Sequence, residues 1–379
     1  MFSSATQWNA QNLQPLRAIG DPLADAAVSE LFDHGGIAAM NELMRNLVVN
    51  EYPLPDSLPP VIRVYLEQSR ELPPWANVGQ IRAGEQVFWR YGPKLILILT
   101  CYALPYCYLG RNGAPVLAMT NRLISNPTRR IVETAQLVVD VMQAGGLTTS
   151  DGRGRLTIQK VRLMHAAIRR LAPQAPDWKA EFGLPVNQED LAGTLMSFSS
   201  ISLAGLEKLD VQLSEADIEA YLHCWNVVGF LLGIQEDLLP ANAAAGRGLS
   251  EAIAAHQFGP SPSGQMLSAS LNQMIAGILP GTVFDRMPDL LNRYFLGDQA
   301  AEWLGLKPAA HAGVAAAPLR VAGKIFGDAV ADSAALKLMA EHAGKLLIGA
   351  IMLCERGGNR PAFTIPGDLQ QKWGVNWTG

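Results

Sequence analysis

Charged side chains are scarce in this sequence: Asp, Glu, Lys and Arg make up 17% of the 379 residues, against about a quarter in an average globular protein. Hydrophobic residues make up 49%, which excludes a disordered chain, because disorder requires low hydrophobicity and high charge. The formal net charge of -4 excludes a protein that binds nucleic acid through an excess of positive charge. We therefore expect a large apolar core or an apolar cavity, and a small apolar partner.

Cysteines and long hydrophobic runs are also few. Four cysteines in the chain exclude a disulfide scaffold, and the absence of Cys-x-x-Cys excludes a zinc ribbon and a covalently attached c-type haem. The most apolar run, Leu95 to Tyr108, is interrupted by Pro105 and is shorter than the ~18 residues that a membrane-spanning helix needs. The polar N-terminus lacks the pattern of a signal peptide, so we expect a cytoplasmic protein without a membrane segment.

The apolar residues recur mostly at helical spacing. This spacing predicts helices over residues 128–144 and 158–171, and a helix break at Gly35-Gly36. No alternating pattern of useful length indicates strands. We predict an all-α protein with one domain over residues 1–379, in which a globin-like helical core surrounds a pocket. Within it we expect a core over 17–305, C-terminal helices over 306–365 and an irregular tail over 366–379.

The first helix of interest carries a charged trio. Arg130, Glu133 and Thr134 stand at positions i, i+3 and i+4 and so share one face, beside an apolar stripe. From Gln86 to Val132 the sequence contains no Asp or Glu, which makes Glu133 an isolated acid in a basic stretch. The trio is either a solvated, salt-bridged edge or the polar wall of a pocket.

The second helix carries a histidine between two arginines. Arg162 and Arg169 stand at i-3 and i+4 from His165, which borders an apolar stripe. Two guanidinium groups so close favour a neutral imidazole, which is the form that binds metals. The other histidines lack metal-ligand spacing, and a single histidine suffices as ligand only for haem, where the porphyrin supplies four more. The alternative is an ordinary histidine of the core.

Together these two helices resemble the latex clearing protein (rubber oxygenase) and MpaB-type oxygenase family. The resemblance rests on Arg130-x-x-Glu133-Thr134 followed by Arg162-x-x-His165-x-x-x-Arg169. It extends over roughly residues 17–305 through four further stretches: Gly20-Asp21-Pro22-Leu23-Ala24-Asp25, Leu104-Pro105-x-x-Tyr108, Asn187-Gln188-Glu189-Asp190-Leu191 and Gly229-x-x-x-Gly233-Ile234.

The resemblance implies an all-α fold that holds one haem b without a covalent bond. It implies His165 as the axial iron ligand, with Arg162 and Arg169 as the arginines beside it. Arg130 and Thr134 would line the oxygen pocket, and Arg293 is similar to a later arginine of the family.

One position departs from the family pattern. Latex clearing proteins carry a lysine between the matching Arg and Thr, and this lysine can cap the iron; here Glu133 takes its place. The acid that those proteins carry upstream is also absent. We therefore predict that Glu133 is the acid/base of the site.

The expected activity is that of a haem-dependent oxygenase. With O2 as co-substrate, it would cleave a C=C bond of an apolar, isoprenoid or lipid-like substrate, and we expect a smaller molecule than solid rubber. Two alternatives stay open: a haem peroxidase or peroxygenase that uses Glu133 beside Arg130, and a non-enzymatic haem-binding helical protein.

Overall fold

The computed structural model describes residues 8–46, 59–119, 127–278 and 287–306. All regular secondary structure in these ranges is helical, which confirms the predicted all-α class; a lone antiparallel bridge joins Gly110 to Phe258. The α-helices are α1 (Ala10–Leu13), α2 (Pro22–Asn46), α3 (Pro60–Gln68), α4 (Val78–Arg90), α5 (Gly92–Ile98), α6 (Leu104–Tyr108), α7 (Ala114–Met119), α9 (Pro127–Met142), α10 (Arg153–Leu171), α11 (Gln188–Phe198), α12 (Ser200–Lys208), α13 (Glu215–Leu231), α14 (Ala243–Gln257), α15 (Pro262–Ile278), α16 (Met287–Leu296) and α17 (Asp298–Trp303).

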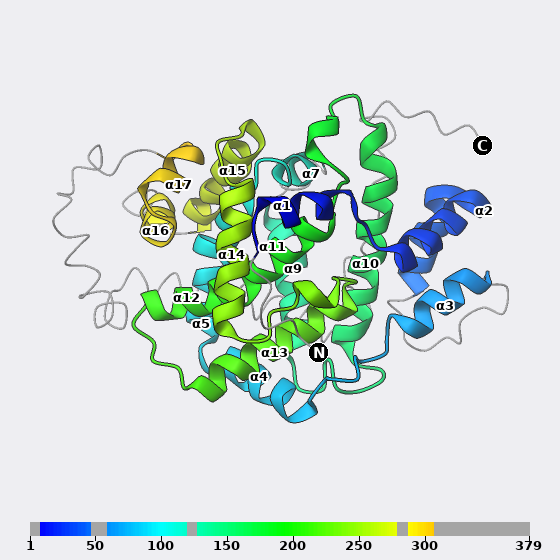
Figure 1. Cartoon of the computed structure of the whole chain (residues 1–379), viewed down its shortest axis with the longest axis horizontal. Helices are drawn as coiled ribbons and strands as arrows, with labels where there is room; N and C mark the ends of the chain where they lie inside the picture. The colour runs from blue at the N-terminus through cyan, green and yellow to red at the C-terminus, as the bar shows by residue number, and fades with distance from the viewer. Residues whose placement is uncertain (1–7, 47–58, 120–126, 279–286, 307–379) are drawn as a thin grey trace.

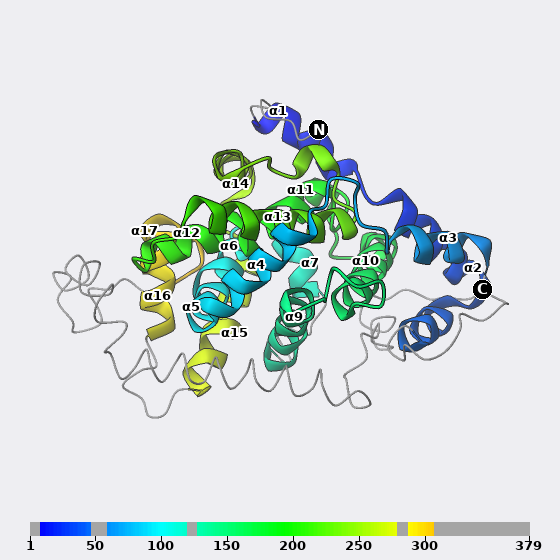
Figure 2. The same ribbon diagram turned by 90° about the horizontal axis from the view of Figure 1, so that it is seen from below.

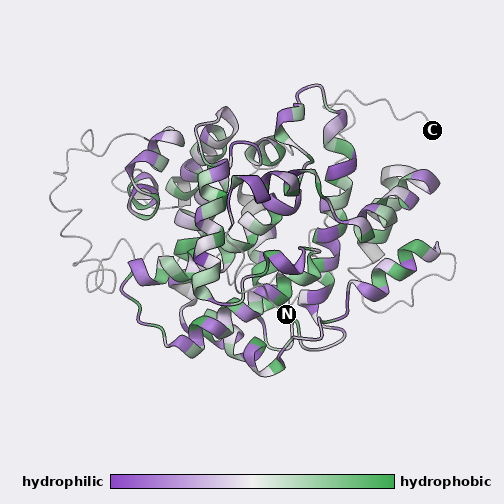
Figure 3. Cartoon of the chain, in the orientation of Figure 1, coloured by the Kyte–Doolittle hydropathy of each residue, from purple (hydrophilic) through white to green (hydrophobic). Residues whose placement is uncertain are grey.

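The helices pack around a centre formed by α9, α10, α11 and α13 (Figures 1 and 2). α4 lies along α13, while α10 packs against both α2 and α9. Most helices carry both hydrophobic and hydrophilic residues (Figure 3), as expected when one face of a helix turns inward. Short 3-10 helices complete the described chain: η1 (Gln14–Ala18), η3 (Ala172–Gln174), η4 (Ala180–Phe182) and η5 (Glu236–Leu238).

The long apolar segment between residues 93 and 108 is a bent, buried helix, as its composition predicts. α5 and α6 are joined by the π-helical turn η2 (Leu99–Ala103). Leu95, Cys101 and Tyr108 within this segment are almost completely buried. In the described ranges, no helix combines the length and the apolar character needed to span a bilayer.

Helix ends agree with the sequence in some places and differ in others. The predicted break at Gly35-Gly36 is present as a non-helical residue, Gly36, inside α2. α10 begins at Arg153, five residues before the predicted start at residue 158. Within α10, a Cβ at position 154 would lie 2.8 Å from the carbonyl oxygen of Asp140. The glycine therefore permits α9 and α10 to approach closely. The predicted C-terminal helices and tail lie outside the described residues.

Candidate functional site

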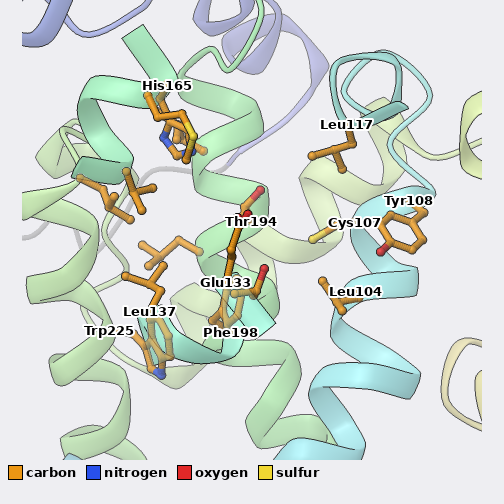
Figure 4. Close-up of a pocket in the computed structure, with 16 residues that line it drawn as sticks. Leu104, Cys107, Tyr108, Leu117, Glu133, Leu137, His165, Thr194, Phe198 and Trp225 are labelled. Atoms are coloured by element: carbon orange, nitrogen blue, oxygen red, sulfur yellow. The ribbon is translucent and has the colours of Figure 1, made fainter. Parts of the chain in front are cut away.

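A cavity of about 150 Å³ lies at the centre of the helical fold. Its walls come from α6, α7, α9, α10, α11 and α13, so helices from distant parts of the chain build it (Figure 4). Most of the lining side chains are apolar. The complete lining consists of Leu104, Cys107, Tyr108, Leu117, Glu133, Thr134, Leu137, Val161, Met164, His165, Leu191, Thr194, Leu195, Phe198, Trp225 and Leu232. The cavity is therefore suited to an apolar molecule that meets a few polar groups.

His165 lies on the wall that α10 contributes. Val161 and Met164 of the same helix line the cavity beside it, and the Nδ1 atom of His165 is buried. At about 100° per residue, these three side chains occupy neighbouring directions on the helix. The sequence placed His165 at the border of an apolar stripe, and the structure turns that border toward the cavity.

Glu133 and Thr134 line the cavity from α9. Glu133 is only 2% exposed, so this residue of the charged trio forms part of the pocket wall and is not a solvated edge. In the view of Figure 4, Glu133 lies between His165 on one side and Leu104 and Tyr108 on the other. The side chain of Arg130 lies outside the described residues.

Arg162 and Arg169 do not line the cavity. Each is instead paired with a carboxylate of the chain. Arg162 makes two hydrogen bonds to Asp21, from Nε to Oδ2 at 2.5 Å and from Nη2 to Oδ1 at 2.9 Å. Arg169 donates from Nε to Oδ1 of Asp25 at 2.7 Å. These carboxylates compensate the two positive charges. The sequence argument that the arginines keep His165 neutral therefore loses its basis, and their contact with a cofactor stays a prediction.

Arg293 lies away from the cavity, on α16. Its Nη1 donates to Oδ1 of Asp298 at 2.8 Å, and its Nη2 donates to the carbonyl oxygen of Leu306 at 3.1 Å. These contacts join α16 to α17 and to the residues just beyond it. Arg293 is not among the residues that line the cavity, and its contact with a cofactor stays a prediction.

Several lining residues carry no motif that would single them out in the sequence. Thr194 and Phe198 belong to α11, and Trp225 belongs to α13. Cys107 stands inside the Leu104-Pro105-x-x-Tyr108 stretch, and its Sγ lies 3.2 Å from Oγ of Ser197. Burial raises the pKa of the Cys107 thiol to about 11, so the cavity wall carries a protonated thiol at neutral pH.

Comparison with known proteins agrees with this fold. A solved structure of latex clearing protein LCP in the closed state shares the fold, with a TM-score of 0.75 and 24% sequence identity over 88% of this chain and 91% of that chain. The rubber oxygenase of Streptomyces sp. (strain K30) is 28% identical over 305 residues, which are 76% of this chain and 71% of that protein.

The matched family covers both helices of the sequence signature. The profile described as "ER-bound oxygenase mpaB/B'/Rubber oxygenase, catalytic domain" matches residues 98–326, more than half of the chain. This span contains α9 with Glu133 and α10 with His165. The chain therefore belongs to the oxygenase family of ER-bound oxygenase mpaB/B' and rubber oxygenase, as the two-helix resemblance predicted.

Proposed function

We propose that this protein is a haem b-dependent oxygenase that uses O2 to cleave a C=C bond of an apolar, isoprenoid or lipid-like substrate. Membership of an oxygenase family supports the reaction class. The observation that carries the proposal is the cavity itself, which brings His165 together with Glu133 and Thr134 inside otherwise mostly apolar walls. The proposal includes a globin-like packing of the helices around the haem.

The residues of the cavity fit a haem group. His165 offers one imidazole from a wall otherwise formed by Val161 and Met164, and apolar walls suit the face of a porphyrin. Among the described residues, no three His, Cys, Asp or Glu side chains gather as ligands for a metal ion. One histidine in apolar surroundings would suit haem, because the porphyrin itself would supply four further ligands. When bound, haem supplies the iron chemistry that activates O2.

The polar side chains of α9 do the proton and hydrogen-bond work in this proposal. Glu133 is buried at the cavity wall, where its carboxyl group holds or moves a proton next to the reacting molecule. The hydroxyl of Thr134 orients a polar atom by hydrogen bonding. Arg130, three residues before Glu133 on the same helix, adds a positive charge to this side in the proposal.

The wall formed by α6 and α7 determines which kind of substrate the cavity suits. Leu104 and Leu117 present aliphatic side chains, and the aromatic Tyr108 lines the cavity beside them. Such walls exclude water and bind hydrocarbon surface with little directional preference. They suit a segment of an isoprenoid or lipid chain, with the double bond brought near Glu133.

The first experiment tests haem binding by its absorption spectrum. The purified protein, supplemented with ferric haemin, is expected to give a Soret band that His165→Ala abolishes or shifts. His34→Ala serves as the matched control, because the His34 side chain is 64% exposed. A band that His165→Ala leaves unchanged overturns the assignment of His165.

The second experiment tests the reaction. With squalene as an isoprenoid probe, we expect oxygen uptake together with carbonyl products from a cleaved double bond. Turnover that depends on peroxide and consumes no O2 instead supports the peroxidase alternative, which the buried Glu133 would also serve. Haem binding without turnover in either assay supports a non-enzymatic haem-binding protein.

A further inference from the structure

Three separate stretches that carry the family resemblance meet in one polar junction behind His165. They are Gly20-Asp21 at the start of α2, Gln188 at the start of α11, and Gly233 just after α13. Each stretch stands at one end of a helix. That helix either builds the cavity or packs against a helix that does. The roles proposed above for the cavity residues do not explain why these stretches converge.

The centre of this junction is the ion pair between Asp21 and Arg162. The two side chains are 3% and 10% exposed, and they share two hydrogen bonds in a fork geometry. Arg162 also donates from Nη1 to the carbonyl oxygen of Leu231 at 3.1 Å. Through this one guanidinium, α10 is joined to the start of α2 and to the end of α13.

The amide of Gln188 joins the same segments from the other side. Its Nε2 donates to the carbonyl oxygens of Gly20 at 2.8 Å and of Gly233 at 2.9 Å. Its Oε1 accepts a hydrogen bond from the backbone N–H of Gln235 at 2.9 Å. The side chain is nearly fully buried, and these three hydrogen bonds fix where α11 begins.

The junction is too tight to admit another residue at position 233. Gly233 has a φ of +84°, which side-chain-bearing residues rarely adopt, and a Cβ there would lie 2.8 Å from Nε of Arg162 and even nearer to Oδ2 of Asp21. The glycine is therefore required for both its backbone angle and its contact with the ion pair. Leu232, which lines the cavity, directly precedes it.

The position of the arginines on α10 connects this junction to His165. At about 100° per residue, Arg162 and Arg169 lie about 40° to 60° to one side of His165, while the cavity-lining Val161 and Met164 lie on the other side. His165 thus stands at the edge between the junction and the cavity. A rotation of α10 by about 20° would move an atom about 6 Å from the helix axis by about 2 Å.

We propose that Asp21 and Gln188 are positioning residues, which fix the rotation of α10 and thereby aim His165 into the cavity. The inference rests on the proposed haem function, since it assigns these residues to the placement of the axial ligand. A second pair, Arg169 with Asp25, supports the same face of α10 one turn beyond His165. A buried pair of this kind is weak evidence for net stability, and in some proteins such pairs fix one arrangement of packed elements.

The structure offers a matched control on the same two helices. Arg170 of α10 pairs with Asp33 of α2 at 3.2 Å, and the two side chains are 34% and 64% exposed. This pair also joins α10 to α2, but it lies in solvent. Asp33→Asn therefore removes the same kind of contact without touching the junction.

The test is a titration with ferric haemin, followed at the Soret band, of the wild type, Asp21→Asn, Gln188→Met and Asp33→Asn. We expect Asp21→Asn and Gln188→Met to weaken haemin binding about tenfold and Asp33→Asn to change it less than twofold. If Asp21→Asn shows no cooperative thermal transition, Gln188→Met decides. Equal affinities for the junction variants and Asp33→Asn overturn the positioning role.

The same substitutions in a His165→Gly protein distinguish a positioning role from a general destabilisation of the fold. In His165→Gly, free imidazole supplies the ligand without being attached to α10. If Asp21 acts through His165, adding Asp21→Asn to this background changes haemin affinity less than twofold. The same tenfold loss in both backgrounds overturns the proposal. Haemin binding that His165→Gly leaves unchanged without imidazole overturns the proposed assignment of His165 as the haem ligand, and so the two failures are distinct.

Discussion

Glu133 and His165 line the same cavity from two helices, α9 and α10, that the close approach at Gly154 brings together. The acid and the imidazole thus reach one cavity, although neither helix alone would form a site. This arrangement lets the role of each side chain be separated by substitution.

Glu133→Gln tests the proposed proton transfer. Glutamine keeps the size of the side chain and removes the ionisable group, so we expect oxygen uptake to fall about a hundredfold while the Soret band stays in place. Oxygen electrode and absorption measurements on the same sample check this. Unchanged turnover would contradict a role for Glu133 as the acid/base.

The thiol of Cys107 is expected to react slowly. Its pKa is raised to about 11 by burial, and only the thiolate is nucleophilic. At pH 8, iodoacetamide should modify Cys107 in the native protein about a hundredfold more slowly than in urea, as followed by mass spectrometry. Equal rates in the two states would show that the thiol is accessible and ionised.

Glu85 is expected to make the protein less stable as the pH rises. Burial raises its pKa from 4.5 to about 7, and its Oε1 finds no hydrogen-bond partner among the described residues. Because the folded state holds this proton more tightly than the unfolded state, the free energy of unfolding falls between pH 4.5 and 7 and stays lower above pH 7.

Replacement by glutamine removes this dependence. Glu85→Gln should raise the free energy of unfolding by about 2 kcal/mol at pH 8 and change it little at pH 5, as measured by urea denaturation. Glu67→Gln, at an exposed position of α3, is the control and should have no such effect. A Glu85→Gln variant that is no more stable than the wild type at pH 8 would rule this out.

His223 is expected to act in the opposite direction. Its Nε2 accepts a hydrogen bond from the backbone N–H of Asn77 at 2.9 Å, and burial lowers the pKa of the imidazole. Since the unfolded state takes up this proton more readily, stability is full above pH 6.5 and falls as the pH drops through the lowered pKa.

Thermal unfolding at pH 7.5 and pH 5 checks this. The wild type should lose more stability between the two pH values than His223→Gln. His34→Gln, at an exposed site, should behave like the wild type. Identical pH profiles for His223→Gln and the wild type would exclude the effect.

The periodicity of the sequence was sufficient to predict the two helices that carry Glu133 and His165, whereas for both residues it left a place at a pocket as one of two interpretations. His165 and Glu133 stand beside apolar stripes on amphipathic helices, and an amphipathic helix turns that side inward. The break at Gly36 was also predictable, since glycine interrupts helices locally. These features depend on neighbours within a few residues.

The partners of the arginines were not predictable in this way. Asp21 lies 141 positions from Arg162, and Asp25 lies 144 positions from Arg169. Which carboxylate meets a guanidinium depends on how distant helices pack, and the sequence contains many carboxylates. For the same reason the walls contributed by Thr194 and Phe198 emerged only from the fold.

The π-helical turn at Leu99–Ala103 determines which changes in chain length the cavity wall tolerates. A π turn accommodates one residue more than an α-helical turn, while in an α-helix each residue rotates the remainder of the helix by about 100°. Deleting one residue within the π turn would leave an α-helical turn and keep Leu104, Cys107 and Tyr108 close to their present directions. Deleting one residue from α5 would instead turn all three away from the cavity, which is equivalent to replacing a whole wall of the site.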